Sequence, residues 1–380
     1  MTSAIMAGHA KRVLVLVGTR PEAIKLASLV GALRDQPGVI TSFVSSGQHP
    51  RMVASTLEHL GSSTDLALAA VPAGTSLSRT VRHLRDHCRD TAIGWGADAI
   101  VVQGDTATAY AGALAGHAAG IPVAHVEAGL RTQTPSRPFP EEPFRRRIAT
   151  LAAWHFAPTR IAADHLLAEG VPADAVHVVG NTVIDILRRT LQALPMPLPV
   201  GDHVVLTLHR RENYGHGMDH VCNAVLALLA RHPELRVVSP LHPNPLVGAK
   251  MRRLLGGHPR IELMPPLDYQ PFIQLIATAR LVITDSGGIQ EEAPYLGVPV
   301  LVVRDATERP EALAYGGLRL VPPQGDSVLA AAEAALAAAR PTPVPFDATA
   351  PFGDGHSGVR IAGVLAAALP GQLPFQQDVQ

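Results

Sequence analysis

Short apolar runs alternate with longer helical stretches along this chain, and this alternation constrains its fold more than any other feature. Continuous runs rich in Val, Ile and Leu, separated by stretches of helical periodicity, are typical of parallel sheets covered on both faces. One expected set of strands comprises residues 13–17, 41–45, 99–103, 123–126 and 176–179. The other comprises residues 204–208, 236–240, 261–264, 281–284, 300–303 and 318–321. Two such sets predict an α/β protein with two doubly wound, Rossmann-like domains.

A proline-rich segment, residues 194–200, marks the expected domain boundary. Proline blocks helix continuation and favours an extended linker, and 380 residues suit two domains. We therefore expect a first domain at 1–194 and a second at 195–355. A helix at 356–370, after a second proline-rich break, is expected to pack back on the first domain.

Composition excludes several classes of protein. The formal net charge is zero, which argues against binding to nucleic acid or to anionic membranes. Residues 1–12 contain no apolar signal segment, and no apolar run approaches the ~20 residues of a spanning helix, so we expect a cytoplasmic protein. Cys88 and Cys222 lie far apart in expected helices, and the histidines lack HExxH-type spacing, so neither a disulfide nor a metal site is expected.

Ser286, Gly287 and Gly288 lie between an apolar run and an expected helix. Free backbone N–H groups and the positive helix end at such a turn form a site for an anion such as a diphosphate. Glu292, one helical turn further on, is placed to accept hydrogen bonds from a ribose diol, and Arg309 offers a fork suited to phosphate.

This Asp-Ser-Gly-Gly turn has two other interpretations. The same string surrounds the nucleophile of trypsin-like proteases, but those are all-β proteins, whereas here strands and helices alternate. A purely structural glycine turn stays open, since a glycine motif depends on its context.

Charged residues follow several other expected strands. Because ligands of open parallel sheets bind at the carboxyl ends of strands, we expect Asp105, Glu127, Glu141 and His209 to converge on a crevice between the domains. Neighbouring carboxylates raise one another's pKa, which suits acid–base chemistry. The alternatives are that Asp105 only caps a helix, Glu141 is only a first-turn helix charge and His209 is structural; His242 beside a proline fits turn chemistry equally well.

Eight motifs follow one another along the chain. They are Gly18-Thr19-Arg20-Pro21-Glu22, Gly104-Asp105-Thr106, His125 to Arg131, Pro140-Glu141-Glu142, Gly180-Asn181-Thr182, His209 to Asn213, Asp285 to Glu292 and Thr307 to Glu311. Together they resemble one known family, the bacterial non-hydrolysing UDP-N-acetylglucosamine 2-epimerases, and their order and spacing match from about residue 12 to residue 365.

The resemblance implies a GT-B fold with the active site in the cleft between two Rossmann-like domains. It implies interconversion of UDP-GlcNAc and UDP-ManNAc: abstraction of the C2 proton, elimination of UDP to a 2-acetamidoglucal, then re-addition of UDP. No nicotinamide or other cofactor is implied, because nothing is oxidised. A UDP-sugar is the implied partner, and the family suggests a homodimer that supplies cell-envelope polysaccharides.

The resemblance also assigns residues to roles. The implied acid–base groups are Asp105, Glu127, Glu141 and His209, with Arg145 supporting the carboxylates. Residues implied to hold UDP are Arg20, Lys25, His242, Phe272, Ser286, Gly287, Gly288, Glu292 and Arg309, with Phe272 near the uracil. Domain closure over the uncharged glucal is expected.

The chain departs from the family pattern where many bacterial members bind a second, activating UDP-GlcNAc. Gln48 and His49 are the candidate residues of that allosteric site, and they are followed here by Pro50-Arg51 in place of the usual basic and polar pair. Pro143-Phe144 also replaces a usual asparagine before Arg145. We therefore expect altered regulation, and the same changes leave room for a modified sugar.

Four alternatives stay open on the sequence. A GT-B glycosyltransferase would use the same nucleotide site, since fold alone does not decide the reaction. An epimerase of a related UDP-2-acetamido sugar, a hydrolysing epimerase and a catalytically inactive UDP-sugar-binding protein are the others. The acid–base set at family spacing favours the epimerase.

Overall fold

The computed structural model describes residues 10–132, 134–135, 138–195, 197–209, 216–242 and 244–369. They fall into two compact units. Unit 1 comprises the chain up to Ile186 together with the chain from Gly355 onward, and unit 2 is Leu187–Asp354. The division lies within helix α7 (Thr182–Ala193), ahead of the proline-rich segment at 194–200.

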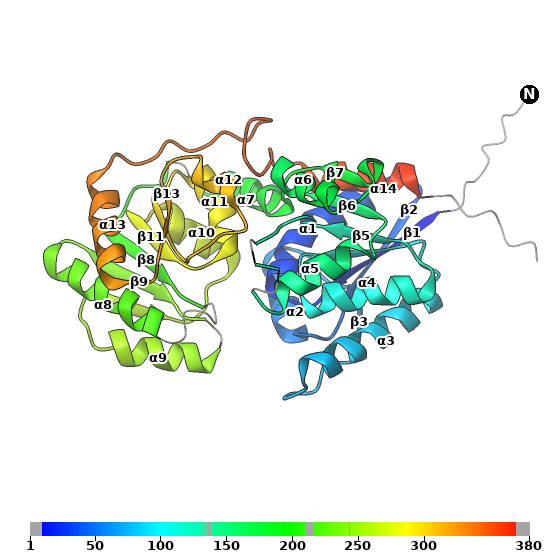
Figure 1. The fold of residues 1–380 in the computed structure, drawn as a ribbon, viewed down its shortest axis with the longest axis horizontal. Coiled ribbons are helices and arrows are strands. Elements are labelled where there is room, and N and C mark those ends of the chain that lie inside the picture. Colours follow the sequence, from blue (N-terminus) through cyan, green and yellow to red (C-terminus); the bar gives the residue numbers. More distant parts are fainter. Residues whose placement is uncertain are drawn as a thin grey trace, which may run out of the picture. The chain divides into compact units, whose positions relative to one another are not determined.

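Unit 1 is built on a seven-stranded parallel sheet with the order β3-β2-β1-β4-β5-β6-β7 (Figure 1). Its strands are β1 (Lys11–Val17), β2 (Val39–Ser45), β3 (Leu66–Ala67), β4 (Ala99–Gln103), β5 (Val123–Val126), β6 (Trp154–Ala157) and β7 (Val176–Val178). Its helices are α1 (Arg20–Arg34), α2 (Pro50–His59), α3 (Leu77–Trp95), α4 (Ala107–Ala119), α5 (Glu141–Ala149), α6 (Arg160–Ala168), the 3-10 turn η1 (Ala173–Ala175), the start of α7, and α14 (Ser357–Ala368). The order reverses between β1 and β4, so the ligand-binding edge of such a sheet lies at the ends of these two strands.

Helix α14 belongs to unit 1 although it lies near the end of the chain. Asp185 of α7 accepts hydrogen bonds from the backbone N–H groups of Ser357 (2.9 Å) and Gly358 (2.7 Å), and so caps the first turn of α14. Gly358 lies so close to α1 that an added Cβ would be 3.0 Å from the Leu29 nitrogen. The apolar side of α14, including Ile361 and Leu365, completes a core formed by α1 and the sheet.

Unit 2 has a six-stranded parallel sheet with the order β10-β9-β8-β11-β12-β13. Its strands are β8 (His203–Thr207), β9 (Arg236–Pro240), β10 (Ile261–Met264), β11 (Leu281–Thr284), β12 (Val300–Val303) and β13 (Leu318–Val321). Its helices are the rest of α7, α8 (His216–Arg231), α9 (Pro245–Leu255), α10 (Tyr269–Ala277), α11 (Gly287–Leu296), α12 (Pro310–Leu313) and α13 (Gly325–Ala337).

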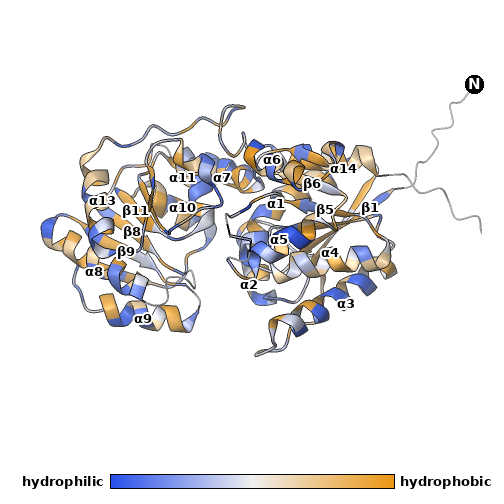
Figure 2. Ribbon diagram, viewed as in Figure 1, coloured by the Kyte–Doolittle hydropathy of each residue, from blue (hydrophilic) through white to orange (hydrophobic). Residues whose placement is uncertain are grey.

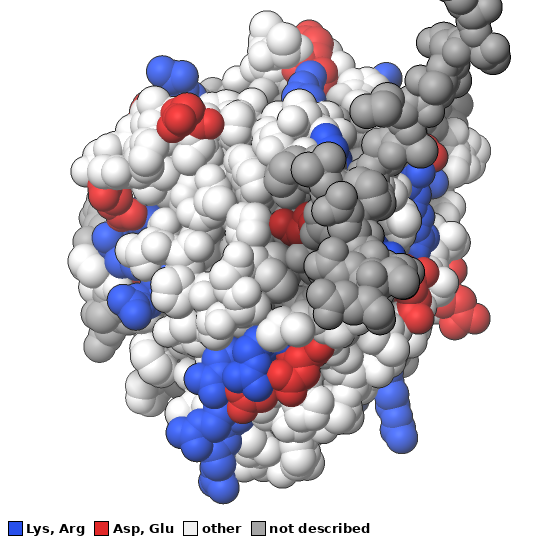
Figure 3. Space-filling view, turned by 90° about the vertical axis from the view of Figure 1, so that its right-hand side faces the viewer, with Lys and Arg blue, Asp and Glu red and all other residues white. Residues whose placement is uncertain are grey.

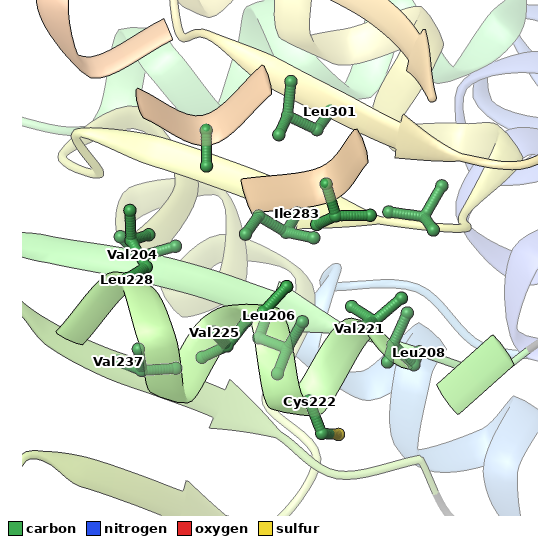
Figure 4. Packing of buried hydrophobic residues seen from close by; sticks show 14 of the residues in the cluster. Val204, Leu206, Leu208, Val221, Cys222, Val225, Leu228, Val237, Ile283 and Leu301 are labelled. Carbon is green, nitrogen blue, oxygen red and sulfur yellow. The ribbon is translucent and has the colours of Figure 1, made fainter. Parts of the chain in front are cut away.

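Helical spacing on α8 produces the main core of unit 2. Val221, Val225 and Leu228 recur at the three- and four-residue spacing that places side chains on one helix face. They pack over Leu206 and Ile283 of the sheet (Figure 4). Cys222 joins the same cluster as an unpaired, buried residue, and Cys88 of α3 is likewise free and buried.

Side-chain polarity follows the layers of each unit. Figure 2 shows largely hydrophobic strands and helices with one hydrophobic and one hydrophilic side. Figure 3 shows basic and acidic side chains next to each other on the surface of unit 1. On α3, Arg85 pairs with Asp86 and Arg89 pairs with Asp90. Within the part of the chain that the structure describes, no helix combines the length and apolar character needed to cross a membrane.

All expected strands are present, with ends shifted by at most a residue or two, so the α/β prediction with two parallel sheets is confirmed. Two strands of unit 1 were missed. β3 has two exposed residues and no apolar run to reveal it, and β6 reads Trp-His-Phe-Ala, where His155 interrupts the apolar pattern.

Candidate active site

Glu127 follows β5 in a strained conformation. Among the described residues it is the one residue other than glycine with a positive φ, 64°. Such a conformation costs about 1 kcal/mol or more, and it persists where the surrounding structure enforces it, often at functional sites. Strain at this strand end therefore marks Glu127 as a functional candidate.

Two donors from neighbouring segments hold the buried Glu127 carboxylate. Lys25 Nζ of α1 lies 2.6 Å from Glu127 Oε2, and the Gln103 amide at the end of β4 donates to the same oxygen. A buried cation at this distance favours the ionised carboxylate. The Lys25 ammonium, which the family resemblance assigns to UDP, is thus an ion-pair partner of Glu127 in this structure.

Asp105, at the end of the neighbouring strand β4, is held by Arg145. The guanidinium reaches Asp105 Oδ2 through Nε at 2.8 Å and Nη2 at 2.6 Å, and it reaches the buried Glu142 through Nη1 at 3.0 Å. Thr106, not Asp105, accepts the capping bond from Ala109 N at the start of α4. The interpretation of Asp105 as a helix cap is therefore wrong, and its carboxylate is held by the arginine.

Glu141 begins helix α5, on the same face as Arg145 four residues later. Its side chain is half-buried. Its place in the first turn fits a residue that only interacts with the helix dipole. The same helix also carries Arg145, the partner of Asp105, so an acid–base role for Glu141 stays a prediction as well.

Glu22 is a buried carboxyl group that was not among the candidates predicted from the sequence. It is fully buried and accepts hydrogen bonds from Gly18 N at 2.9 Å and Thr106 Oγ1 at 2.6 Å. Burial raises the pKa of Glu22 to about 7, although these hydrogen bonds act in the opposite direction. Glu22 thereby joins the loop after β1, where Arg20 begins α1, to the loop that carries Asp105.

Gln48 and His49 lie after β2, at the same end of the unit 1 sheet. Gln48 Oε1 accepts hydrogen bonds from Thr108 N at 3.0 Å and Thr108 Oγ1 at 2.7 Å, at the start of α4. His49 is exposed at the position that caps α2. Their allosteric role stays a prediction.

The strand–turn–helix expected in unit 2 is confirmed, although the helix begins two residues earlier than expected and includes Gly287 and Gly288. β11 ends at Thr284, Ser286 occupies the capping position and α11 begins at Gly287. Ser286 N donates to Thr284 Oγ1 at 3.0 Å, which fixes the turn. The helix is long enough to present a positive N-terminal end to an anion.

Arg309 lies directly over this turn. A Cβ added to Gly287 would be 2.7 Å from Arg309 Nη1, so glycine at this position gives room for the guanidinium. Two buried carboxylates hold the guanidinium: Glu291 Oε1 at 2.5 Å from Nε and Glu308 Oε1 at 2.6 Å from Nη1. The sequence predicted Arg309 but not the two glutamates, which lie within the same motifs.

Glu292 and Phe272 lie on neighbouring helices. Tyr269, on α10 with Phe272, donates its hydroxyl to Glu292 Oε1 at 2.7 Å. Burial, followed by the Glu292 charge, raises the pKa of Tyr269 well above its ordinary value, so it remains a donor. This hydrogen bond orients the carboxylate that the sequence assigned to a ribose.

His209 lies between two partners at the ends of adjacent strands. Its Nδ1 is 2.8 Å from Asp285 Oδ1, and its ring stacks on His242 with 5.4 Å between centroids. The rest of this motif, residues 210–213, lies outside the described residues. Asp285 was part of a quoted motif but had no assigned role.

The structure thus forms two sets of residues. Unit 1 brings together Lys25 with Glu127, and Asp105 with Arg145. Unit 2 brings together Arg309 with the turn at Gly287, and His209 with His242. Convergence of His209 with the carboxylates of unit 1 stays a prediction. Over the described ranges, no group of three or more His, Cys, Asp or Glu side chains has the geometry to hold a metal ion.

Comparisons with known proteins agree on one family. The family model described as UDP-N-acetylglucosamine 2-epimerase matches residues 31–366. A probable UDP-N-acetylglucosamine 2-epimerase of Ralstonia solanacearum is 40% identical over 371 residues, which cover 94% of this chain and 99% of the relative.

Solved structures show the same likeness. The crystal structure of UDP-GlcNAc 2-epimerase from Neisseria meningitidis bound to UDP-GlcNAc has a TM-score of 0.87 at 35% identity, covering 94% of this chain and 100% of the other. The glycotransferase of kitacinnamycin has a TM-score of 0.60 at 14% identity, covering 95% and 100%, which is a likeness of fold alone. With the two parallel sheets, these matches identify the two Rossmann-like domains of a GT-B fold.

Proposed function

The chain belongs to the UDP-N-acetylglucosamine 2-epimerase family, a family of isomerases, and we propose that it interconverts UDP-GlcNAc and UDP-ManNAc. Its similarity to a solved epimerase bound to UDP-GlcNAc supports this substrate. The observation that carries the proposal is the set of cation-held carboxylates at the ends of β4 and β5, Asp105 with Arg145 and Glu127 with Lys25.

The reaction that this chemistry supports begins with removal of the C2 proton by one of the acid–base groups. The bond between C1 and the UDP oxygen breaks, UDP leaves with the bonding electrons, and a 2-acetamidoglucal remains. UDP then adds back to C1 while C2 receives a proton on the opposite face. Asp105, Glu127, Glu141 and His209 are the proposed acid–base groups, and Arg145 holds a carboxylate in place.

UDP must be held after it leaves, and unit 2 supplies the means. The turn at Ser286, Gly287 and Gly288 offers backbone N–H groups at a helix N-terminus, and Arg309 lies over it. The fixed guanidinium needs no reordering when a phosphate arrives, which favours tight binding. Arg20, Lys25, His242, Phe272 and Glu292 complete the proposed UDP-binding set.

Incubation with UDP-GlcNAc in deuterated water, followed by proton NMR, tests the proposed function. UDP-ManNAc with deuterium at C2 is the expected product. Glu127→Gln and His209→Asn should each slow exchange at C2. UDP-GlcNAc that binds but stays unexchanged would contradict the proposal and favour a glycosyltransferase, another UDP-sugar or a binding protein. Released ManNAc with free UDP would indicate a hydrolysing enzyme.

We also propose a homodimer, as the family resemblance implies, and a location in the cytoplasm, as we expect from the sequence. Light scattering on the purified protein, combined with size-exclusion chromatography, tests the dimer. A monomer at the concentration used in the activity assay would contradict it.

A further inference from the structure

Strand register brings Asp285 next to His209. β8 and β11 run parallel, with Thr207 paired to Thr284 at their carboxyl ends. The two threonine hydroxyls are 2.7 Å apart, and Asp285 N donates to Thr207 O at 3.3 Å. The residues that follow each strand therefore leave the sheet side by side.

Asp285 holds both the backbone and the ring of His209. Its two carboxylate oxygens accept the His209 backbone N–H at 3.0 and 3.1 Å, and Oδ1 also lies 2.8 Å from the ring Nδ1. The Asp285 side chain is fully buried, whereas 31% of the His209 side chain is exposed. A buried carboxylate thus supports a histidine whose side chain is partly exposed.

These contacts determine the position of the imidazole proton. An ionised carboxylate only accepts hydrogen bonds, so Nδ1 must carry the proton that it donates to Asp285. Nε2 of the neutral ring is then left with a lone pair. Stacking on His242, at the end of the adjacent strand β9, restricts rotation of the ring.

We propose that Asp285 is a positioning residue that fixes His209 in the Nδ1–H tautomer, so that the lone pair lies on Nε2, the nitrogen that accepts or returns a proton. The pair lies beside Ser286 and Gly287, where the proposed diphosphate site begins. Asp285 thus connects the acid–base group and the anion turn through one strand end. The inference deepens the proposed function and rests on it for its catalytic consequence.

Asp285→Asn is the informative substitution. Its amide oxygen can still accept the His209 backbone N–H, while its NH₂ group can donate to Nδ1 and impose the opposite tautomer. Asp285→Glu keeps the acceptor chemistry on a longer side chain. Glu333→Gln is a matched control, because Glu333 Oε2 lies 2.7 Å from His232 Nε2 in another His–carboxylate pair of unit 2, on α13.

The tautomer is measured without substrate, in long-range ¹H–¹⁵N correlation spectra of the full-length protein labelled in histidine. The His209 signals are assigned by their loss in His209→Asn, and spectra are recorded above the ordinary pKa of histidine. The expected result is Nδ1–H in the wild type and Nε2–H, or a mixture, in Asp285→Asn. An Nε2–H ring in the wild type would overturn the proposal, and this measurement does not depend on whether any variant folds.

Kinetics test the consequence. We expect Asp285→Asn to lower kcat for epimerisation by about 10²- to 10⁴-fold, in line with other His–carboxylate pairs, with little change in KM. Asp285→Glu should restore part of kcat, and Glu333→Gln should leave kcat unchanged. Equal kcat for Asp285→Asn and wild type would contradict the proposal that Asp285 supports catalysis through His209. A wild type without epimerase activity would instead refute the proposed function, and the tautomer measurement would still stand.

Discussion

At the scale of single residues, the acid–base candidates are fixed by partners that come from neighbouring strand ends. Glu127 is held by Lys25, Asp105 by Arg145 and His209 by Asp285. Buried partners of this kind limit the motion of a side chain. The partners are therefore as informative for mutagenesis as the candidates themselves.

Removal of Lys25 should destabilise unit 1 because it leaves the buried Glu127 carboxylate without its cation. We expect Lys25→Met to lower the free energy of unfolding by about 3–5 kcal/mol, and the double variant with Glu127→Gln to recover most of the loss. Both tryptophans of the chain, Trp95 and Trp154, lie in unit 1, so urea unfolding followed by tryptophan fluorescence reports on this unit. Additive losses in the double variant would show that the pair is not coupled.

Glu22 makes stability depend on pH in an unusual direction. The pKa of Glu22 is about 7 in the folded protein, against an ordinary value of 4.5. Its contribution to the free energy of unfolding is therefore full below about pH 4.5 and is lost as the pH rises through about 7. Glutamine resembles the protonated form of Glu22. Above about pH 7, Glu22→Gln should therefore raise the free energy of unfolding by roughly 3 kcal/mol relative to wild type, and below about pH 4.5 it should change it little. Thermal unfolding at both ends of the range measures this difference. A difference that does not vary with pH would contradict it.

Two buried histidines change the stability of unit 1 with pH in the direction opposite to Glu22. Burial lowers the pKa of His125 to about 3 and that of His155 to about 4, from 6.5. Because the unfolded chain takes up these protons first, stability falls as the pH drops below about 6.5. Acid unfolding of Glu22→Gln should therefore be steeper between about 4.5 and 6.5 than that of the wild type, where the two effects partly cancel.

At the scale of elements, α4 lies unusually close to the sheet of unit 1. A Cβ on Gly112 would be 2.6 Å from both Leu16 Cδ1 and Val102 Cγ1, and one on Gly116 would overlap Val123 Cγ2. These two glycines let α4 pack close to the sheet, and Thr106, next to Asp105, caps the first turn of the helix. Close packing of this helix thus positions one end of the candidate site.

Gly116→Ala should destabilise unit 1 by about 1–3 kcal/mol, because strand side chains and the Ile121 carbonyl leave no room for the methyl group. Gly31→Ala in α1 is the matched control: no atom lies within 4 Å of its added Cβ, so it should stabilise the unit by up to about 1 kcal/mol. Urea unfolding by tryptophan fluorescence compares the two. Equal effects would mean that helix propensity, not packing, decides.

The sequence predicted elements better than contacts. Strands with uninterrupted apolar runs, such as β4 and β11, were predicted with their observed bounds, because burial on both faces leaves a continuous pattern. The turn at Ser286 followed from its glycines. The pairs Lys25–Glu127 and His209–Asp285 could not be predicted, since they depend on strand order and register that local patterns do not specify. The same holds for Glu22, whose burial no local pattern reveals.

At the scale of the whole molecule, unit 2 interrupts unit 1 in the chain. Unit 1 needs α14 to cover α1, whereas unit 2 is one continuous segment. The apolar surface of α1 would face water without α14, and covering such surface contributes roughly 25 cal/mol per Å². Unit 2 should therefore fold when it is expressed alone, whereas unit 1 should lose stability when α14 is removed.

Residues 187–354, expressed alone, should fold and bind UDP, as measured by calorimetry.

Residues 1–186 should unfold at a lower urea concentration than unit 1 in the full chain. Joining residues 355–369 to them through a short glycine linker should restore much of the lost stability. Tryptophan fluorescence follows both unit 1 fragments. Equal unfolding midpoints with and without residues 355–369 would show that α14 contributes little.

The interruption of unit 1 also has a consequence for biosynthesis. A ribosome that adds 5–20 residues per second needs roughly ten to thirty seconds to translate unit 2 after Ile186. During that interval α1 and its sheet have emerged but their covering helix has not been made. The apolar surface of the nascent first unit thus stays uncovered while the second unit is made, and it is covered only after α14 has been synthesised.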